Sequence, residues 1–352
     1  MTAVVLPGGA PGRILVTRLR RIGDAILSLP VLDALHERFP DAGIDFLAEE
    51  GPTQAAVGHP AVRRILSIQT RAAWPLPAPW PLLRALRRER YDWVIDLYGN
   101  PRTAILSAWT GAPVRVGPDR RGRRRLYTHL IPAVREPLSA VNHHLLALRA
   151  LGISASPSAP RIHLSNAERT LGRSIVRDRL PGHGPAVGLH VGNRWPSKRW
   201  PENNFASLAR VLSRSGRRLA ILAGPGEEIL AARLLRLDGV APAAMIAGLP
   251  LRTYWSVVAA LDALVTNDGS PLHAGPAVGT ATVGILGPTV PEIWFPYDAR
   301  HGHQLLCREI WCRPCHRHEC ARLDCLEWIS VEDAAAAVER ALAREGADDA
   351  VA

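Results

Sequence analysis

Short apolar runs rich in β-branched residues alternate with segments of helical periodicity along most of this chain. A continuous apolar run of this length is typical of a strand buried on both faces, as in a parallel sheet. Such runs lie at 13–17, 43–48, 62–68, 91–97, 186–189, 218–223, 263–266 and 282–286. Helical spacing follows several of them, as in Ala25–Phe39, Leu82–Arg90 and Phe205–Ser213. The alternation predicts βαβ units and an α/β fold with parallel sheets.

A small, polar, proline-rich stretch at Ser154–Pro160 divides the pattern into two halves. With 352 residues the chain is long enough for two domains with separate cores. We expect an N-terminal domain at 1–160, a second domain at 161–330, and a C-terminal helix and tail at 331–352. Ser330, with Asp333 three residues later, predicts the start of that helix. This C-terminal helix and tail could pack back on the N-terminal domain.

Lys198 is the only lysine among the 43 lysines and arginines of the chain. It lies in the loop His190–Pro201, directly after an apolar run, where open α/β sheets bind ligands. Lysine is a compact point charge, whereas arginine is a planar fork, so a site for one phosphate oxygen could require the lysine. The alternative is that Lys198 persists by chance as a solvent-exposed surface residue. Tryptophans and prolines beside the lysine favour a rigid loop.

Glycine-containing turns follow three strands of the second half: Gly192, Gly224 with Gly226, and Gly269 in Asn-Asp-Gly-Ser. Free backbone N–H groups at such turns bind anions, and together with Lys198 they predict a diphosphate site. In the first half, Asp24 stands at the start of a helix. It could cap that helix or act as a general base, and the residues leave both readings open.

Three segments, 18–30, 190–201 and 266–273, resemble glycosyltransferase family 9, the lipopolysaccharide heptosyltransferases. They occur in the family's order, and the resemblance runs from about residue 13 to residue 342. It implies a GT-B fold, in which two Rossmann-like domains with parallel sheets face a cleft. It also implies inverting, metal-independent transfer of heptose from ADP-heptose to an inner-core lipopolysaccharide acceptor. The alternatives are another nucleotide sugar for a different surface glycan, or a non-catalytic protein that binds anionic ligands.

By motif position, Asp24 matches the family's catalytic base and Lys198 matches the lysine on the donor diphosphate. The residues expected at the donor are Gly192, Arg194, Lys198, Gly224, Glu227, Asp268, Gly269, Ser270 and His273. Family members commonly read Asp-Ser-Gly-Pro-Met-His where this chain has Asp-Gly-Ser-Pro-Leu-His. The exchange of Gly and Ser moves the glycine by one position, and glycine is the residue that adopts a left-handed backbone conformation freely.

The net charge of +11 indicates an anionic partner, which could be nucleic acid, anionic lipid or a phosphorylated small molecule. Six arginines lie in 115–125, either on a solvated loop or at an anionic acceptor. The residues expected at the acceptor are Arg21, Arg120, Arg121, Arg123, Arg124 and Arg125. The run contains no interleaved aromatic residue, which argues against nucleic acid. A dehydrogenase is disfavoured because no Gly-x-Gly-x-x-Gly follows the first strand of either domain.

The segment 71–81 is rich in tryptophan and proline and precedes an arginine-bearing helix. It is either a stiff surface loop or an interfacial membrane contact. Residues 1–11 lack the features of a signal peptide, and no run of about 18 apolar residues occurs. We therefore expect a cytoplasmic protein that is peripherally associated with the inner face of the inner membrane.

All five cysteines lie within 307–325, which includes the spacing Cys312-x2-Cys315-x4-Cys320-x4-Cys325. A Cys-x2-Cys pair suits tetrahedral zinc, although the later spacings are shorter than in common zinc modules. A structural zinc site on Cys312, Cys315, Cys320 and Cys325, an iron–sulfur centre, and thiols without metal or with a disulfide all stay open. The reaction implied by the resemblance requires no cofactor, so the cluster is not expected to be catalytic.

Overall fold

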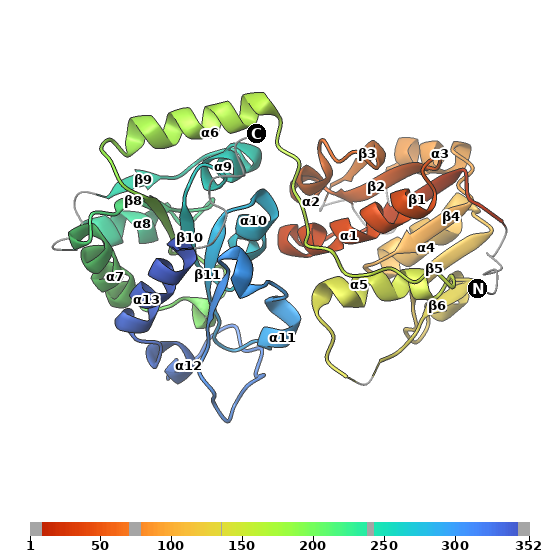
Figure 1. Ribbon diagram of the computed structural model, residues 1–352. Helices are drawn as coiled ribbons and strands as arrows, with labels where there is room; N and C mark the ends of the chain where they lie inside the picture. The colour runs from red at the N-terminus through yellow and green to blue at the C-terminus, as the bar shows by residue number, and fades with distance from the viewer. Residues whose placement is uncertain (1–8, 70–78, 135, 238–242, 344–352) are drawn as a thin grey trace. The chain divides into compact units, whose positions relative to one another are not determined.

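The computed structural model describes residues 9–69, 79–134, 136–237 and 243–343 (Figure 1). The chain forms two compact units, Met1–His163 and Leu164–Ala352. The division follows the predicted linker, in a stretch at 153–165 without regular secondary structure. Each unit contains one six-stranded parallel sheet, so the predicted α/β fold with two parallel sheets is confirmed.

The sheet of the first unit has the order β3-β2-β1-β4-β5-β6. Its strands are β1 (Arg13–Thr17), β2 (Gly43–Glu49), β3 (Val62–Ile68), β4 (Trp93–Asp96), β5 (Val114–Pro118) and β6 (His129–Ile131). Its helices are α1 (Ile22–Arg38), α2 (Glu50–Thr53), α3 (Trp80–Arg88), α4 (Pro101–Thr110) and α5 (Ala140–Arg149), with short 3₁₀ turns η1 (Gln54–Ala56) and η2 (Arg124–Leu126). The order reverses between β1 and β4, so the ligand-binding edge expected for this sheet is at their carboxyl ends.

The sheet of the second unit has the order β12-β11-β10-β7-β8-β9. Its strands are β7 (Ala186–His190), β8 (Arg218–Leu222), β9 (Ala244–Ile246), β10 (Ala263–Asn267), β11 (Ala281–Ile285) and β12 (Gln304–Leu306). Its helical segments are α6 (Asn166–Arg179), η3 (Pro196–Lys198), α7 (Glu202–Arg214), α8 (Glu228–Leu235), α9 (Leu251–Val258), α10 (Ser270–Val278), α11 (Pro291–Trp294), η4 (Ala299–His301), α12 (Asp324–Glu327) and α13 (Val331–Leu342). Here the order reverses between β7 and β10.

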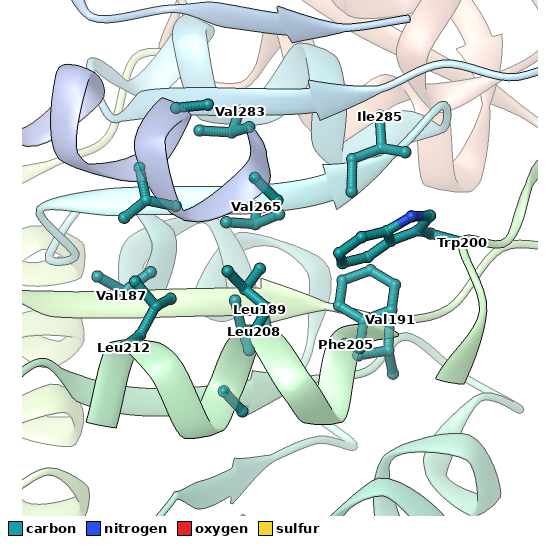
Figure 2. Close-up of a cluster of buried hydrophobic side chains, with 14 of the residues drawn as sticks. Val187, Leu189, Val191, Trp200, Phe205, Leu208, Leu212, Val265, Val283 and Ile285 are labelled. Atoms are coloured by element: carbon teal, nitrogen blue, oxygen red, sulfur yellow. The ribbon is translucent and has the colours of Figure 1, made fainter. Parts of the chain in front are cut away.

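The core of the second unit explains why the loop after β7 is well anchored. Val187, Leu189 and Val191 alternate along β7 and its end, and point to one face of the sheet, where α7 and α13 pack (Figure 2). Trp200 is fully buried in this layer, packs edge-on against Phe205 at 5.1 Å, and donates its indole N–H to the Ile329 carbonyl at 3.1 Å. The carboxyl-terminal end of the loop is therefore held in the core.

Helix α13 belongs to the second unit rather than forming a separate C-terminal segment. Its buried face, Ala334, Ala337, Val338 and Ala341, packs with α7 and against β10, β11 and β12. Ser330 accepts the Asp333 backbone N–H at 3.0 Å, as the predicted cap requires. The described part of this C-terminal segment therefore packs on the sheet of the second unit.

The structure also contains strands that were not expected from the sequence. Four strands were not predicted, because they are short and lack a distinctive apolar run: β5, β6, β9 and β12. Arg115, the first arginine of the run, lies on β5. Among the described residues, no helix is both long enough and apolar enough to span a bilayer.

Candidate functional site

The three glycine turns of the second unit lie at the carboxyl ends of adjacent strands. Gly192 follows β7, Gly224 follows β8 and Gly269 follows β10, and these strands are neighbours in the sheet. The amide of Asn193 donates to the Asp268 carbonyl at 2.6 Å, which joins two of the turns across the reversal of strand order. The predicted turns therefore gather at one edge of the sheet, at its topological switch point.

The sole lysine lies at this edge and is paired. The ammonium of Lys198 is 2.6 Å from the Asp268 carboxylate and 4.8 Å from the centre of the Trp195 ring. The side chain of Lys198 is only 14% exposed, and that of Asp268 is 4% exposed. Thr289 also donates its hydroxyl to the same carboxylate oxygen at 2.5 Å. The surviving lysine is thus held in place, and it is not a solvated remnant.

The two ends of the lysine loop are fixed by two asparagines, one in the loop itself and one at the end of β10. Asn193 accepts the Trp195 N–H at 2.9 Å through its side-chain oxygen. Asn267 accepts the Trp200 N–H at 2.9 Å and donates to the Val191 carbonyl at 3.0 Å. These two asparagines were not predicted as site residues. Their signal in the sequence was only their place beside the glycine turns, Asn193 after Gly192 and Asn267 at the end of β10.

Glu227 lies beside Gly192 and is held by a buried histidine. Its carboxylate accepts the Gly224 N–H at 2.9 Å and lies 3.2 Å from His190 Nε2, while His190 Nδ1 lies 3.0 Å from the Tyr254 hydroxyl. Burial raises the pKa of Glu227, but the hydrogen bond and charge of His190 outweigh burial and leave this pKa below its ordinary value. The site therefore presents an ionised carboxylate at the edge that also carries Lys198.

The start of α10 provides backbone donors beside the Lys198–Asp268 pair. Gly269 is the N-cap and has no side chain to occupy the free N–H groups of the first turn. Its φ is −161°, which is extended backbone, so the Gly-Ser exchange does not depend on left-handed conformations. What favours glycine is space, because a Cβ at 269 would lie 3.0 Å from the Asn193 amide. His273 is buried, with Nδ1 2.9 Å from the Tyr297 hydroxyl, and Arg194 is exposed.

In the first unit, Asp24 is bound by an arginine that the sequence analysis did not single out. One Asp24 oxygen lies 2.7 Å from the Arg18 guanidinium, and the other accepts the Arg21 N–H at 3.2 Å in a capping box. Arg18 is 91% buried by its relative exposure of 9%, and its guanidinium lies 4.9 Å from the centre of the Tyr98 ring. Asp24 therefore caps α1 and also lies at the switch point between β1 and β4.

Two residues of the arginine run act on the buried Tyr127. Burial raises the pKa of the Tyr127 hydroxyl, and the charges of Arg123 and Arg120 oppose this rise. The side chain of Arg115 instead donates to the Leu126 and Ala112 carbonyls. Arg124 pairs with Asp119 at 3.7 Å. Most of the predicted acceptor arginines are exposed: Arg21, Arg120, Arg121, Arg124 and Arg125.

The cysteines differ in their exposure and in the groups that surround them. Among the described residues, no group of three or more His, Cys, Asp or Glu side chains is arranged to hold a metal ion. Cys325 is buried next to Gly287, whereas Cys320 is exposed and accepts the Leu323 and Arg322 N–H groups. Cys312, Cys315 and Cys320 still act electrostatically on Cys325. Several of the thiols are therefore neighbours, and in the part of the chain that the structure describes they show no metal-holding arrangement.

The tryptophan- and proline-rich segment falls mostly outside the described residues, at 70–78. Its last tryptophan, Trp80, begins α3 and is 50% exposed. It packs edge-on against Trp109 of α4 at 5.8 Å, and the Arg84 guanidinium lies 5.8 Å from its centre. The described part of this surface thus combines exposed aromatic rings with positive charge.

The sequence model of glycosyltransferase family 9 (heptosyltransferase) matches residues 80–325. The chain belongs to glycosyltransferase family 9. It is 28% identical to lipopolysaccharide heptosyltransferase 1 of Pseudomonas aeruginosa over 88% of this chain and 87% of that protein. The family 9 glycosyltransferase of Veillonella parvula has a similar structure, with a TM-score of 0.80, 23% identity, and coverage of 94% of this chain and 97% of that one. An Escherichia coli heptosyltransferase solved with ADP-2-deoxy-2-fluoro heptose gives a TM-score of 0.68 at 24% identity, covering 93% and 99%. The protein is a GT-B glycosyltransferase of the heptosyltransferase family, as the sequence motifs predicted.

Proposed function

We propose that this family 9 enzyme transfers heptose from ADP-heptose to an inner-core lipopolysaccharide acceptor, with inversion and without a metal ion. The observation that carries the proposal is the buried Lys198–Asp268 pair beside the start of α10, at the switch point of the second sheet. The names of the relatives support the choice of sugar and acceptor, and the E. coli structure with ADP-2-deoxy-2-fluoro heptose supports an ADP-linked donor.

The second unit would bind the donor. The Lys198 ammonium and the Ser270 N–H would stabilise negative charge that builds on the departing diphosphate, without a metal ion. The ionised Glu227 carboxylate would accept hydrogen bonds from hydroxyl groups of the nucleotide ribose. Gly192 leaves room for that carboxylate, since a Cβ at 192 would lie 2.0 Å from the Glu227 carboxyl carbon.

The first unit would bind the acceptor. Asp24 would take the proton of the acceptor hydroxyl as its oxygen attacks the anomeric carbon. The bond from that carbon to the diphosphate breaks, and its electron pair leaves with the diphosphate. One such displacement inverts the anomeric configuration. Arg18, which pairs with Asp24 at 2.7 Å, would hold that carboxylate in place for this step.

Two measurements test the proposal. A thermal-shift screen of nucleotide sugars should show the largest rise in Tm with ADP-heptose, because a ligand that binds the native state stabilises it by mass action. Purified enzyme should then release ADP from ADP-heptose only when a heptose-deficient lipopolysaccharide acceptor is present. Transfer from another nucleotide sugar, with none from ADP-heptose, would support the alternative of a different surface glycan. Nucleotide binding without any transfer would support a non-catalytic protein.

A cytoplasmic location and peripheral association with the inner membrane belong to the same proposal. Trp80 and Trp109, with Arg84 and Arg88 on α3, combine interfacial aromatic rings with charges that attract anionic lipid. The double variant Trp80→Ala/Trp109→Ala should pellet less with vesicles rich in anionic phospholipid. Trp311→Ala is the matched control, because Trp311 is 84% exposed in the other unit. Equal pelleting of the double variant and the wild type would remove this surface from the proposal.

A further inference from the structure

The middle of the lysine loop is held by a segment more than a hundred residues away in the sequence. Its two ends are fixed by Asn193 and Asn267, as described above. Between those points, Ser197 donates its backbone N–H to the His318 carbonyl at 3.1 Å and its hydroxyl to the Arg317 carbonyl at 2.5 Å. Ser197 is only 2% exposed, so both hydrogen bonds are shielded from water.

A stack of side chains extends from this segment to the lysine. The His318 ring lies on the Trp195 ring, with centroids 3.9 Å apart and planes 29° apart. The Lys198 ammonium lies 4.8 Å from the centre of that same Trp195 ring. Trp195 is therefore in contact with both residues, and its orientation fixes one side of the ammonium while Asp268 fixes the other.

The bracing segment is itself tied to the strand end next to Asp268. Arg313 donates to the Gly287 carbonyl at 2.8 Å, and the Cys315 N–H donates to the Pro288 carbonyl at 3.3 Å. Thr289, the next residue, holds the Asp268 carboxylate. The cysteine-bearing segment thus connects to the loop of Lys198 and, through residues 287–289, to the acidic partner Asp268.

We propose that His318 is a positioning residue for Lys198, acting through the Trp195 ring, and that the segment 313–318 is a brace for the diphosphate-binding loop. This inference rests on the proposed function, because it assigns Lys198 to the diphosphate of the donor. His318 acts through Trp195 and does not itself take a proton or contact the reacting atoms. The role assigned to the brace needs its backbone path and its aromatic ring, and it needs no metal ion on the cysteines.

The test measures ADP binding by calorimetry together with donor KM and kcat. His318→Ala removes the stack and should weaken ADP binding about 3- to 10-fold, in line with the strength of an aromatic pair. His318→Phe keeps a ring on Trp195 and should restore binding to within about 2-fold of wild type. Ser197→Ala removes one hydrogen bond to the brace and should also weaken binding. The matched control is His316→Asn, since residue 316 is exposed on the same segment and asparagine tolerates its positive φ of 49°.

A double-mutant cycle separates positioning from general loss of structure. If His318 acts through Lys198, then His318→Ala should have little further effect on ADP binding in a Lys198→Ala background. Wild-type affinity in His318→Ala, or an equal loss in both backgrounds, overturns the inference while leaving the proposed function in place. Failure of the wild-type enzyme to bind ADP and to transfer heptose refutes the proposed function itself, and this inference with it.

Discussion

The carboxylate of Asp268 lies 2.6 Å from the ammonium of Lys198, although the two residues are separated by β8, β9 and β10 in the chain. The pair forms because β7 and β10 are neighbours in the sheet, so the loops that follow them meet. Both side chains are shielded from water, so their charges interact more strongly than an exposed pair does. Before any ligand binds, the lysine already has a fixed position.

Replacement of Lys198 should remove most of the transfer activity. Lys198→Ala deletes a preorganised positive charge at the proposed leaving group, and we expect kcat to fall by about 10²- to 10³-fold. Lys198→Arg should recover only part of this loss, because a planar fork does not reproduce a point charge. Steady-state kinetics with ADP-heptose measures both, with exposed Arg236→Ala as the control. A Lys198→Ala enzyme that keeps more than about a tenth of wild-type kcat would contradict the assigned role.

Replacement of Asp24 should stop proton removal while preserving the fold. Asp24→Asn keeps the shape of the side chain but removes the base, so we expect kcat to fall by about 10²- to 10⁴-fold. Loss of the ion pair with Arg18 should lower Tm by only a few degrees. Asp41→Asn, an exposed site in the same unit, should behave as wild type in both measurements. Normal turnover by Asp24→Asn would leave this residue only its capping role.

A methyl group at residue 192 should displace Glu227. The Cβ of Gly192→Ala would lie 2.0 Å from the Glu227 carboxyl carbon, so the carboxylate must move away from His190. We expect weaker ADP binding, measured by calorimetry, with little change in Tm. Gly12→Ala is the control, because its Cβ would meet its nearest neighbour at an ordinary 3.5 Å. Unchanged ADP affinity in Gly192→Ala would show that Glu227 does not contact the nucleotide.

The ion pair between Glu168 and Arg252 should make the second unit sensitive to acid. The hydrogen bond from Arg252 is the main cause that lowers the pKa of Glu168 from 4.5 to about 2. Because the folded-state pKa is depressed, the stabilisation is present above about pH 4.5 and is lost as the pH falls toward 2. After discounting for partial exposure, it is worth about 1–3 kcal/mol.

Thermal unfolding between pH 6 and pH 2.5 checks this prediction. Wild-type Tm should fall more steeply with acid than the Tm of Glu168→Gln, which has no carboxylate to titrate. Equal slopes for the two proteins would show that this ion pair does not contribute to acid sensitivity.

The five thiols should react with iodoacetamide in a defined order. Cys320 is exposed, and the Leu323 and Arg322 N–H groups lower the pKa of its thiol, so it should react first. Burial raises the pKa of Cys325 to about 11, so it should react last. Mass spectrometry of tryptic peptides after timed alkylation at pH 7.5 measures the order. Early labelling of Cys325 would mean that the segment around it opens in solution.

The sequence by itself determined the parallel sheets and the places where ligands would be sought. A strand buried on both faces must be a continuous apolar run, and a strand-to-helix turn with free amides favours glycine, so both features are visible locally. The runs at 13–17 and 263–266 and the turns at Gly192, Gly224 and Gly269 were therefore predictable. Short strands such as β6 and β9 contain only three residues each, too few to show a pattern.

Only the tertiary structure decided the partners of the functional side chains. Asp268 beside Lys198, and His318 on Trp195, depend on which strands are neighbours and on the path of loops far apart in the chain. The different environments of the cysteines also come from the fold, which places Cys325 in the core and Cys320 on backbone amides. A local sequence pattern reflects how deeply one segment is buried and which conformation its own backbone adopts. Contacts between distant segments follow from strand order, which leaves no mark in either segment alone.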